Sequence, residues 1–236
     1  MVESMLEVKD LVAGYGASTV LDGLKFSMGV ESVAMLGRNG MGKTTFCNVL
    51  MGLLPALDGQ VIFQGRELIG ETPEKIARAG IAYVPQGRRL FPSLTVDEHL
   101  RMLSKVTEGK RWTPATVLEL FPRLALRRGS EAANLSGGEQ QMLAISRALL
   151  LNAPLLLMDE PSEGLAPKIV DHLVEIVQQL VAEGVAVLVV EQSLGAATRM
   201  AERQLMMVSG AIAAELTAEE LISDTDAQRR YLGVDA

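Results

Sequence analysis

The 236-residue sequence contains one cysteine, Cys47, and only 4% of its residues are aromatic. A single thiol can form neither an internal disulfide nor a cysteine metal cluster, so an apolar core has to stabilise the fold. Lysine and arginine number 22 against 29 aspartates and glutamates, which gives a net charge of −7. An acidic chain with few aromatics lacks the basic stacking surface that nucleic acids require, so we expect no nucleic-acid partner.

Long apolar runs are also missing. A membrane-spanning helix needs about 20 consecutive apolar residues, and runs such as 185–190 are far shorter. The first five residues lack the positive and apolar regions of a signal peptide, so we expect the chain to stay in the cytoplasm. From its length we expect a single domain over residues 1–236 that carries an elaborated insert.

Short runs of branched apolar residues alternate with stretches of helical period, which is typical of a parallel β-sheet covered by helices. The clearest helix is predicted over 167–183, because proline lies in its first turn and Gly184 follows its end. Strands are predicted at 33–36, 81–84, 155–158, 185–190 and 205–208.

Two further regions differ from this pattern. The segments 6–8, 19–28 and 60–64 indicate a small antiparallel addition, and Ser209-Gly210 indicates a hairpin turn. The stretch from Gln86 to Leu135 has no strand pattern, contains three prolines and includes a predicted helix over 95–103. We therefore predict a helical subdomain inserted at approximately 87–152.

A phosphate-binding loop is the clearest chemical motif. The segment 37–44 matches G-x-x-x-x-G-K-[ST] and lies between an apolar strand and a helical stretch. Its backbone N–H groups can surround phosphate oxygens, Lys43 can reach the β- and γ-phosphates, and Thr44 can ligate Mg²⁺. The predicted nucleotide-binding residues here are Gly37, Arg38, Asn39, Gly40, Met41, Gly42, Lys43, Thr44 and Thr45.

Two carboxylates end the predicted strand at 155–158. Asp159 emerges at the edge of the sheet where α/β proteins bind ligands, so it can hold Mg²⁺. Glu160 follows it, where its side chain could polarise the water that attacks the γ-phosphate.

The segment Leu135-Ser-Gly-Gly-Glu-Gln140 opens a predicted helix. Ser136 and Glu139 have the spacing of a capping box. Two consecutive glycines in a helix interior each cost roughly 1 kcal/mol relative to alanine, and a cap gives no reason for Gly137 and Gly138. Bare backbone N–H groups at a helix N-terminus do suit a phosphate.

With these motifs the whole sequence resembles the ATP-binding subunits of ABC transporters. The resemblance implies an α/β P-loop NTPase (RecA-like) core with an antiparallel β subdomain and an inserted helical subdomain. It implies that two subunits pair head to tail, with ATP and Mg²⁺ between the phosphate loop of one and the signature helix of the other. Ser136, Gly137, Gly138 and Glu139 would then bind the partner's nucleotide, and Tyr15 would stack on adenine, with an ordinary loop tyrosine as the alternative reading of Tyr15.

The same resemblance assigns three more positions. Gln86 would contact Mg²⁺ and the reacting water, and the 162–167 loop would cross between subunits, although Ala166 stands where many relatives carry aspartate. At the switch position most relatives have histidine, whereas this chain has Gln192. We expect its two histidines, His99 and His172, to be surface residues on helices, and turnover to require no group that titrates like histidine.

The switch Val190-Glu-Gln192, the segment 84–92 and the closing Tyr231-Leu-Gly233 resemble LivF-type subunits of branched-chain amino acid uptake transporters. Importers of urea and short amides share much of this pattern and remain an alternative, as does a non-transport regulatory ABC ATPase. The implied partners are a homodimeric copy or a sister ATP-binding subunit, membrane permease subunits and, indirectly, a periplasmic solute-binding protein. The implied location is the inner face of the plasma membrane, as a peripheral subunit.

Other nucleotide-dependent classes fit less well. The chain contains no Asn-Lys-x-Asp or Thr-Lys-x-Asp guanine reader, and only 48 residues separate Gln86 from Leu135. A genome-maintenance ABC ATPase would carry a long coiled coil in that interval. A translation factor of this family would normally have two cassettes, whereas this chain has one phosphate loop.

Overall fold

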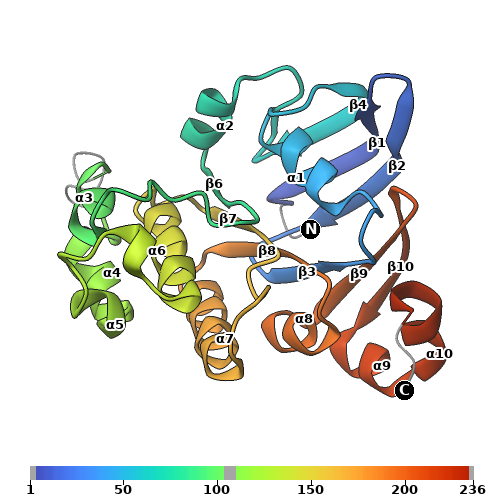
Figure 1. Ribbon diagram of the computed structural model, residues 1–236. Coiled ribbons are helices and arrows are strands. Elements are labelled where there is room, and N and C mark those ends of the chain that lie inside the picture. Colours follow the sequence, from blue (N-terminus) through green and yellow to red (C-terminus); the bar gives the residue numbers. More distant parts are fainter. Residues whose placement is uncertain (1–3, 104–109, 234–236) are drawn as a thin grey trace.

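The computed structural model describes residues 4–103 and 110–233, and all structural statements refer to this part of the chain. Its larger sheet is built from β3 (Ser32–Leu36), β6 (Ile81–Val84), β7 (Leu155–Asp159), β8 (Ala186–Glu191), β9 (Arg203–Val208) and β10 (Ala211–Thr217). The spatial order is β10-β9-β3-β8-β7-β6 (Figure 1). Neighbours from β9 to β6 run parallel, and β10 is antiparallel to β9.

The predicted parallel strands are therefore confirmed, with ends that differ by one or two residues. Every residue of β7 and β8 is buried. Continuous burial explains why these strands appear in the sequence as unbroken apolar runs rather than as alternating patterns.

The predicted antiparallel addition is a second sheet, with the order β2-β1-β4-β5. Its strands are β1 (Leu6–Tyr15), β2 (Ser18–Met28), β4 (Ala56–Phe63) and β5 (Arg66–Glu67). Helix α1 (Lys43–Leu50) shares one apolar cluster with both sheets, through buried residues such as Phe46 and Leu50. This contact fixes the start of α1, and with it the phosphate loop, against the edge of the larger sheet.

Helices follow β4 and occupy the interval between β6 and β7. They are α2 (Pro73–Ala79), α3 (Val96–Arg101), α4 (Pro114–Leu120), α5 (Pro122–Ala125) and α6 (Gly137–Leu149), with a short 3-10 turn at Ala132–Asn134. Figure 1 shows α3 to α6 grouped at one end of the molecule, beside α7 (Pro167–Ala182). Residues 104–109 of the predicted helical insert lie outside the described residues.

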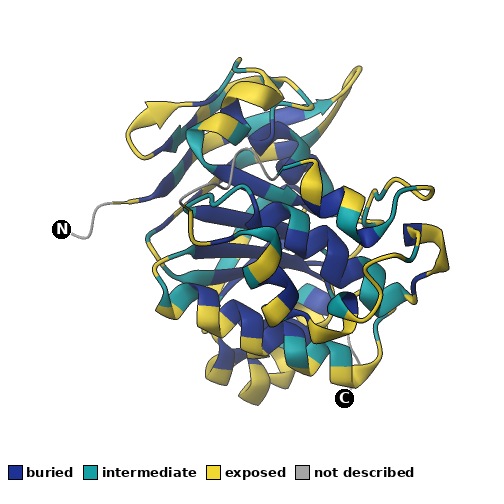
Figure 2. Ribbon diagram, turned by 90° about the vertical axis from the view of Figure 1, so that its left-hand side faces the viewer, coloured by how far each residue is buried: buried dark blue, intermediate teal, exposed yellow. Residues whose placement is uncertain are grey.

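Helix α7 confirms the predicted amphipathic helix. It buries Leu173, Ile176, Val177 and Leu180. These side chains join one apolar cluster with α6 and with one face of the larger sheet, which gives the dark blue centre of Figure 2. The helical region thus shares its core with the sheet region.

The expectation that His99 lies on the surface is wrong. Its side chain is completely buried. Its Nε2 accepts a hydrogen bond from Phe91 N at 3.1 Å, and its Nδ1 lies 2.9 Å from the carbonyl oxygen of Thr95. Burial lowers the pKa of His99, so the neutral ring is favoured. His172 on α7 is half-buried and lies 3.3 Å from Glu175.

The C-terminal part extends the helical cover of the face on which α7 packs, because Ala34 in its apolar cluster is paired with Val189 in the cluster of α7. It contains α8 (Leu194–Met200), α9 (Ala218–Ser223), α10 (Thr225–Ala227) and a π-helical turn at Gln228–Leu232. Ser209 and Gly210 form the predicted turn between β9 and β10, both with positive φ. Among the described residues, no helix is both long enough and apolar enough to span a membrane.

Candidate functional site

The candidate site lies where four neighbouring parallel strands end. The phosphate loop follows β3, Gln86 follows β6, Glu160 follows β7 and Gln192 follows β8. These four strands are adjacent in the order β3-β8-β7-β6, so their carboxyl ends meet at one edge of the sheet. Sequence-distant motifs are brought together by this topology alone.

The phosphate loop surrounds a cavity of about 490 Å³. Lys43 is only 4% exposed, and its Nζ donates to the carbonyl oxygens of Gly37 and Arg38 at 2.8 and 3.2 Å. Gly37 is needed because a Cβ there would lie 2.6 Å from the carbonyl oxygen of Met207. The cavity is lined by Val20, Asn39, Gly40, Gly42, Lys43, Thr44, Thr45, Gln86, Glu160 and Glu163.

Asp159 is buried beside this cavity. Its Oδ2 accepts a hydrogen bond from the hydroxyl group of Tyr83 at 3.4 Å, while its Oδ1 is buried without a hydrogen-bond partner among the described residues. Burial raises the pKa of Asp159 to about 6, and hydrogen bonds from Thr44 and Tyr83 oppose this shift. A buried carboxylate oxygen without a partner is costly, so its environment fits a cation held by Asp159 and Thr44.

Glu160 lies at the centre of a polar cluster. Its Oε1 is 3.4 Å from Lys43 Nζ, and its Oε2 accepts a hydrogen bond from Gln86 Nε2 at 3.0 Å. The same Gln86 amide donates to Glu163 Oε2 at 3.1 Å. The backbone of Glu160 has a φ of 49°, which is uncommon for a residue with a side chain. The carboxylate of Glu160 therefore lines the cavity, and its contacts with Lys43 and Gln86 hold the side chain in place.

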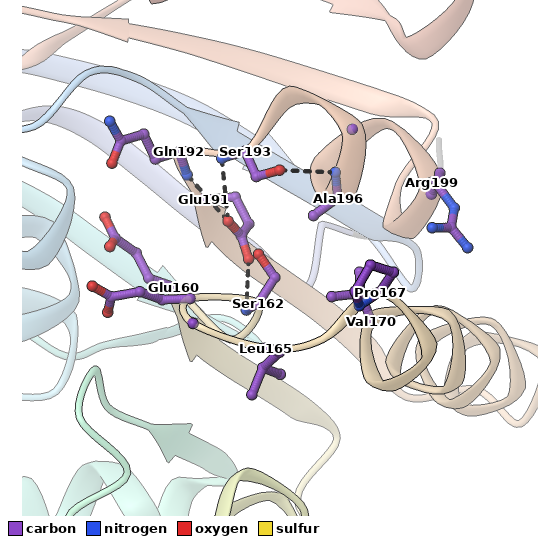
Figure 3. A pocket seen from close by; sticks show the side chains of 13 residues that line it. Glu160, Ser162, Leu165, Pro167, Val170, Glu191, Gln192, Ser193, Ala196 and Arg199 are labelled. Atoms are coloured by element: carbon purple, nitrogen blue, oxygen red, sulfur yellow. Dashed lines mark hydrogen bonds between the residues drawn. The ribbon is translucent and has the colours of Figure 1, made fainter. Parts of the chain in front are cut away.

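A second cavity, of about 730 Å³, adjoins Glu160 and is lined by the 162–167 loop and the start of α8. Figure 3 shows Gln192 and Glu160 on the same side of this cavity, with the Glu191 side chain between the two segments. Gln192 is exposed. The predicted switch residue therefore stands near the predicted water-activating carboxylate without a hydrogen bond between them.

The signature segment forms the predicted capping box at the start of α6. Ser136 N donates to Glu139 Oε2 at 2.7 Å, and Glu139 N donates to Ser136 Oγ at 3.4 Å. A Cβ on Gly137 would lie 3.2 Å from the guanidinium group of Arg88, and one on Gly138 would lie 3.1 Å from the side chain of Ile169. A side chain at either position would therefore require the Arg88 or Ile169 side chain to shift.

Besides Gly37, Arg38, Met41, Asp159 and Gln192, two groups of predicted site residues do not line the phosphate-loop cavity. The signature residues Ser136 to Glu139 lie at the start of α6, and none of them lines this cavity. Tyr15 is 52% exposed, and its hydroxyl oxygen accepts a 3.5 Å hydrogen bond from Asn48 Nδ2. The residues that line this cavity are therefore only part of the predicted nucleotide site.

No role in the nucleotide site was predicted for Glu191, Tyr83 or Arg88. Glu191 and Tyr83 nevertheless form hydrogen bonds with the predicted site residues Gln192 and Asp159, and Arg88 donates to Gln140 of the signature segment. Tyr83 lies one strand away from Asp159, and Arg88 contacts a segment about 50 positions further along the chain. For Glu191 a weak signal existed, since a carboxylate ends an otherwise fully apolar strand.

Comparisons with known proteins agree with this geometry. Residues 21–163 match the ABC transporter family. The branched-chain amino acid transport ATP-binding protein BraG of Pseudomonas aeruginosa is 43% identical over 205 residues, which cover 86% of this chain and 88% of BraG. A probable LivF protein of Archaeoglobus fulgidus is 32% identical, with 98% of this chain and 99% of that protein covered.

A solved structure supports the fold independently. The ADP conformation of an ATP-binding cassette of an ABC transporter superposes with a TM-score of 0.84 at 27% identity, and the match covers 98% of this chain and 99% of that one. The α/β P-loop NTPase fold, with its antiparallel β subdomain and inserted helices, is thereby confirmed. With a family match over most of its length and a full-length relative at 32% identity, the chain belongs to the ABC transporter family.

Proposed function

We propose that the chain is the ATP-hydrolysing subunit of an ABC importer that takes up branched-chain amino acids. The observation that carries this proposal is the convergence of Lys43, Gln86 and Glu160 on one cavity at the edge of the sheet, next to the buried carboxylate of Asp159 at the end of β7. The relatives named BraG and LivF support the choice of branched-chain amino acids.

In the proposed mechanism the triphosphate of ATP lies on the phosphate loop, and Lys43 exchanges its loop carbonyl partners for the β- and γ-phosphates. Thr44, Asp159 and Gln86 are the residues that would hold Mg²⁺, which offsets the charge that develops on the phosphates. Glu160 orients and polarises the attacking water, and Gln86 fixes the carboxylate of Glu160 through their hydrogen bond. Gln192 donates a hydrogen bond to the γ-phosphate but cannot carry a proton to it.

The site needs a second subunit in this proposal. Ser136, Gly137, Gly138 and Glu139 form a helix N-terminus in which Ser136 is exposed and the other three are partly exposed, which suits the γ-phosphate bound by a partner. Tyr15 is accessible for stacking on adenine. The partner is a copy of this chain or a sister ATP-binding subunit, and the pair attaches to membrane permease subunits at the inner face of the plasma membrane. We also propose that residues 1–236 form one domain with a helical subdomain inserted at about 87–152.

The direct test is reconstitution of the chain with its permease and solute-binding protein in vesicles. We expect uptake of leucine, isoleucine and valine that requires internal ATP, and no uptake of urea. Urea or short-amide uptake would contradict the proposed substrate, and ATP hydrolysis without any uptake would favour a regulatory ATPase instead.

The permease contact is proposed at the segment 88–91. Phe91 is 47% exposed and its ring lies 5.5 Å from the guanidinium carbon of Arg147, while Arg89 is exposed beside it. An accessible aromatic ring beside arginines is typical of a protein contact. Because this segment directly follows Gln86, movement at the γ-phosphate can reach the permease through it.

We expect Arg89→Ala combined with Phe91→Ala to leave ATP binding unchanged but to uncouple hydrolysis from uptake in reconstituted vesicles. The control is Leu126→Ala, which removes a side chain that is 85% exposed in the same helical region. This control should transport normally. Normal uptake by the double variant would place the permease contact elsewhere.

The pH dependence of turnover should not require histidine. His99 is buried with both ring nitrogens engaged, and Gln192 does not titrate. Asp159 must be ionised to hold a cation, and its pKa is raised to about 6. We therefore expect kcat/KM to rise with pH up to about 6 and then to level off, because the protonated form is lost above that pKa.

This profile should be the same in the wild-type chain and in the variants His99→Gln and His172→Gln. Loss of the acidic limb in either histidine variant would show that a histidine, rather than Asp159, titrates during turnover.

A further inference from the structure

Glu191 is a buried carboxylate at the end of β8. Its side chain is only 2% exposed. It lies at the boundary between the buried strand residue Val190 and the exposed Gln192. Burial raises the pKa of Glu191, and hydrogen bonds to its carboxylate oppose the shift. Burying a carboxylate costs free energy unless hydrogen bonds compensate for the lost water, so the hydrogen-bond partners of Glu191 matter.

These partners are backbone N–H groups from two separate segments. Glu191 Oε1 accepts from Ser162 N at 2.9 Å. Its Oε2 accepts from Gln192 N at 3.2 Å and from Ser193 N at 3.4 Å. Figure 3 shows the carboxylate between the 162–167 loop and the start of α8, with these bonds drawn.

The two segments have different parts in the proposed function. Gln192 faces the γ-phosphate of the subunit's own nucleotide, and the 162–167 loop leads towards the other subunit. The residues that lead into this loop start at Glu160, whose N–H donates to the carbonyl oxygen of Val190 at 2.8 Å. The segment from Glu160 to Ser162 is thus attached to β8 at both ends, once by backbone and once by the Glu191 side chain.

We propose that Glu191 is a positioning residue that fixes Glu160 and the 162–167 loop relative to Gln192. The inference rests on the proposed function and deepens it. When Gln192 moves on binding the γ-phosphate, the carboxylate carries that movement to Ser162 because the same side chain holds both backbones. One subunit's nucleotide state thereby sets the position of its catalytic carboxylate and of the loop that meets the partner.

The chemistry of the side chain explains why a carboxylate is needed. Both of its oxygens only accept hydrogen bonds, and all three partners only donate. In Glu191→Gln one oxygen is replaced by an NH₂ group, so at least one backbone N–H faces another donor. The volume of the side chain is retained, and the bridge between the two segments is broken.

The test uses the full chain and compares wild type with Glu191→Gln and with the milder Glu191→Asp, whose shorter side chain cannot reach both segments. We expect ADP affinity within two-fold of wild type, kcat lowered at least ten-fold and little change in KM. In a Glu160→Gln background, we expect the dimer that forms with ATP to dissociate at least ten-fold faster.

The matched control is Ser193→Ala. It removes the hydroxyl that caps α8 through Ala196 N at 3.3 Å but leaves the N–H of residue 193 and the carboxylate in place. This control should lower the melting temperature while kcat stays within two-fold of wild type. A purely structural role of Glu191 predicts instead that loss of kcat follows loss of melting temperature in all variants.

The possible failures can be told apart. Wild-type hydrolysis with an unchanged kcat in Glu191→Gln and Glu191→Asp would overturn this inference and leave the proposed function intact. Absence of ATP hydrolysis by the wild-type chain would overturn both.

Discussion

Replacing Glu160 by glutamine is expected to lower ATP hydrolysis at least about 100-fold, the scale on which a positioned general base contributes. Glutamine keeps the shape of the side chain and an oxygen that can accept the hydrogen bond from Gln86 Nε2. It cannot polarise water as a carboxylate does. Nucleotide should therefore stay bound, and the closed pair of subunits should accumulate because ATP is no longer consumed.

Two measurements check this result, namely phosphate release under saturating ATP and the oligomeric state with ATP in size-exclusion chromatography. We expect a dimer for Glu160→Gln with ATP and a shorter-lived one for wild type. The neighbouring Glu163→Gln is a useful comparison, because Glu163 shares the Gln86 amide but lies on the exposed loop. Hydrolysis lost equally in both variants would show that the cluster, rather than Glu160, is responsible.

Lys43→Ala is expected to act on the other half of the reaction. Hydrogen bonds to charged groups contribute about 1.5–3 kcal/mol, so ATP affinity should fall by roughly 10- to 100-fold. The ammonium group is 4% exposed and already directed at the loop by the carbonyl oxygens of Gly37 and Arg38. Little side-chain ordering is then required when phosphate binds.

Isothermal titration with ATP and with ADP measures this effect, and the loss should be larger for ATP because Lys43 reaches the γ-phosphate. Lys75→Ala is the control, since this lysine is exposed on α2 and pairs with Glu71 at 2.9 Å. Its ATP affinity should match wild type. An equal loss of ATP binding in Lys43→Ala and Glu160→Gln would contradict the separate roles assigned to these residues.

The sequence could predict those parts of the protein in which neighbours along the chain determine the structure. The capping box of Ser136 and Glu139 and the helix α7 are short-range patterns, and each was confirmed. The phosphate-loop motif is also short-range, and the helix expected after it begins at Lys43. The strand runs were equally clear, because parallel strands buried on both faces leave unbroken apolar segments. The order of the strands in the sheet was not predicted, because no single segment of the sequence specifies which strands become neighbours.

Tertiary contacts decided what the sequence left open or indicated wrongly. His99 looked like a surface residue, but the 88–91 segment folds back so that Phe91 N meets its ring. The two glycines at the start of α6 had no local reason, and in the structure they lie against the side chains of Arg88 and Ile169, which come from other segments.

By itself, then, the sequence determined the family, the phosphate-loop motif and the identity of the two carboxylates at Asp159 and Glu160. Only the tertiary structure decided which residues hold them, because Tyr83 reaches Asp159 across neighbouring strands and Glu191 reaches Ser162 across separate loops. The physical reason is that motifs are set by backbone conformation over a few residues, whereas burial and hydrogen-bond partners depend on segments that meet only after the sheet has formed.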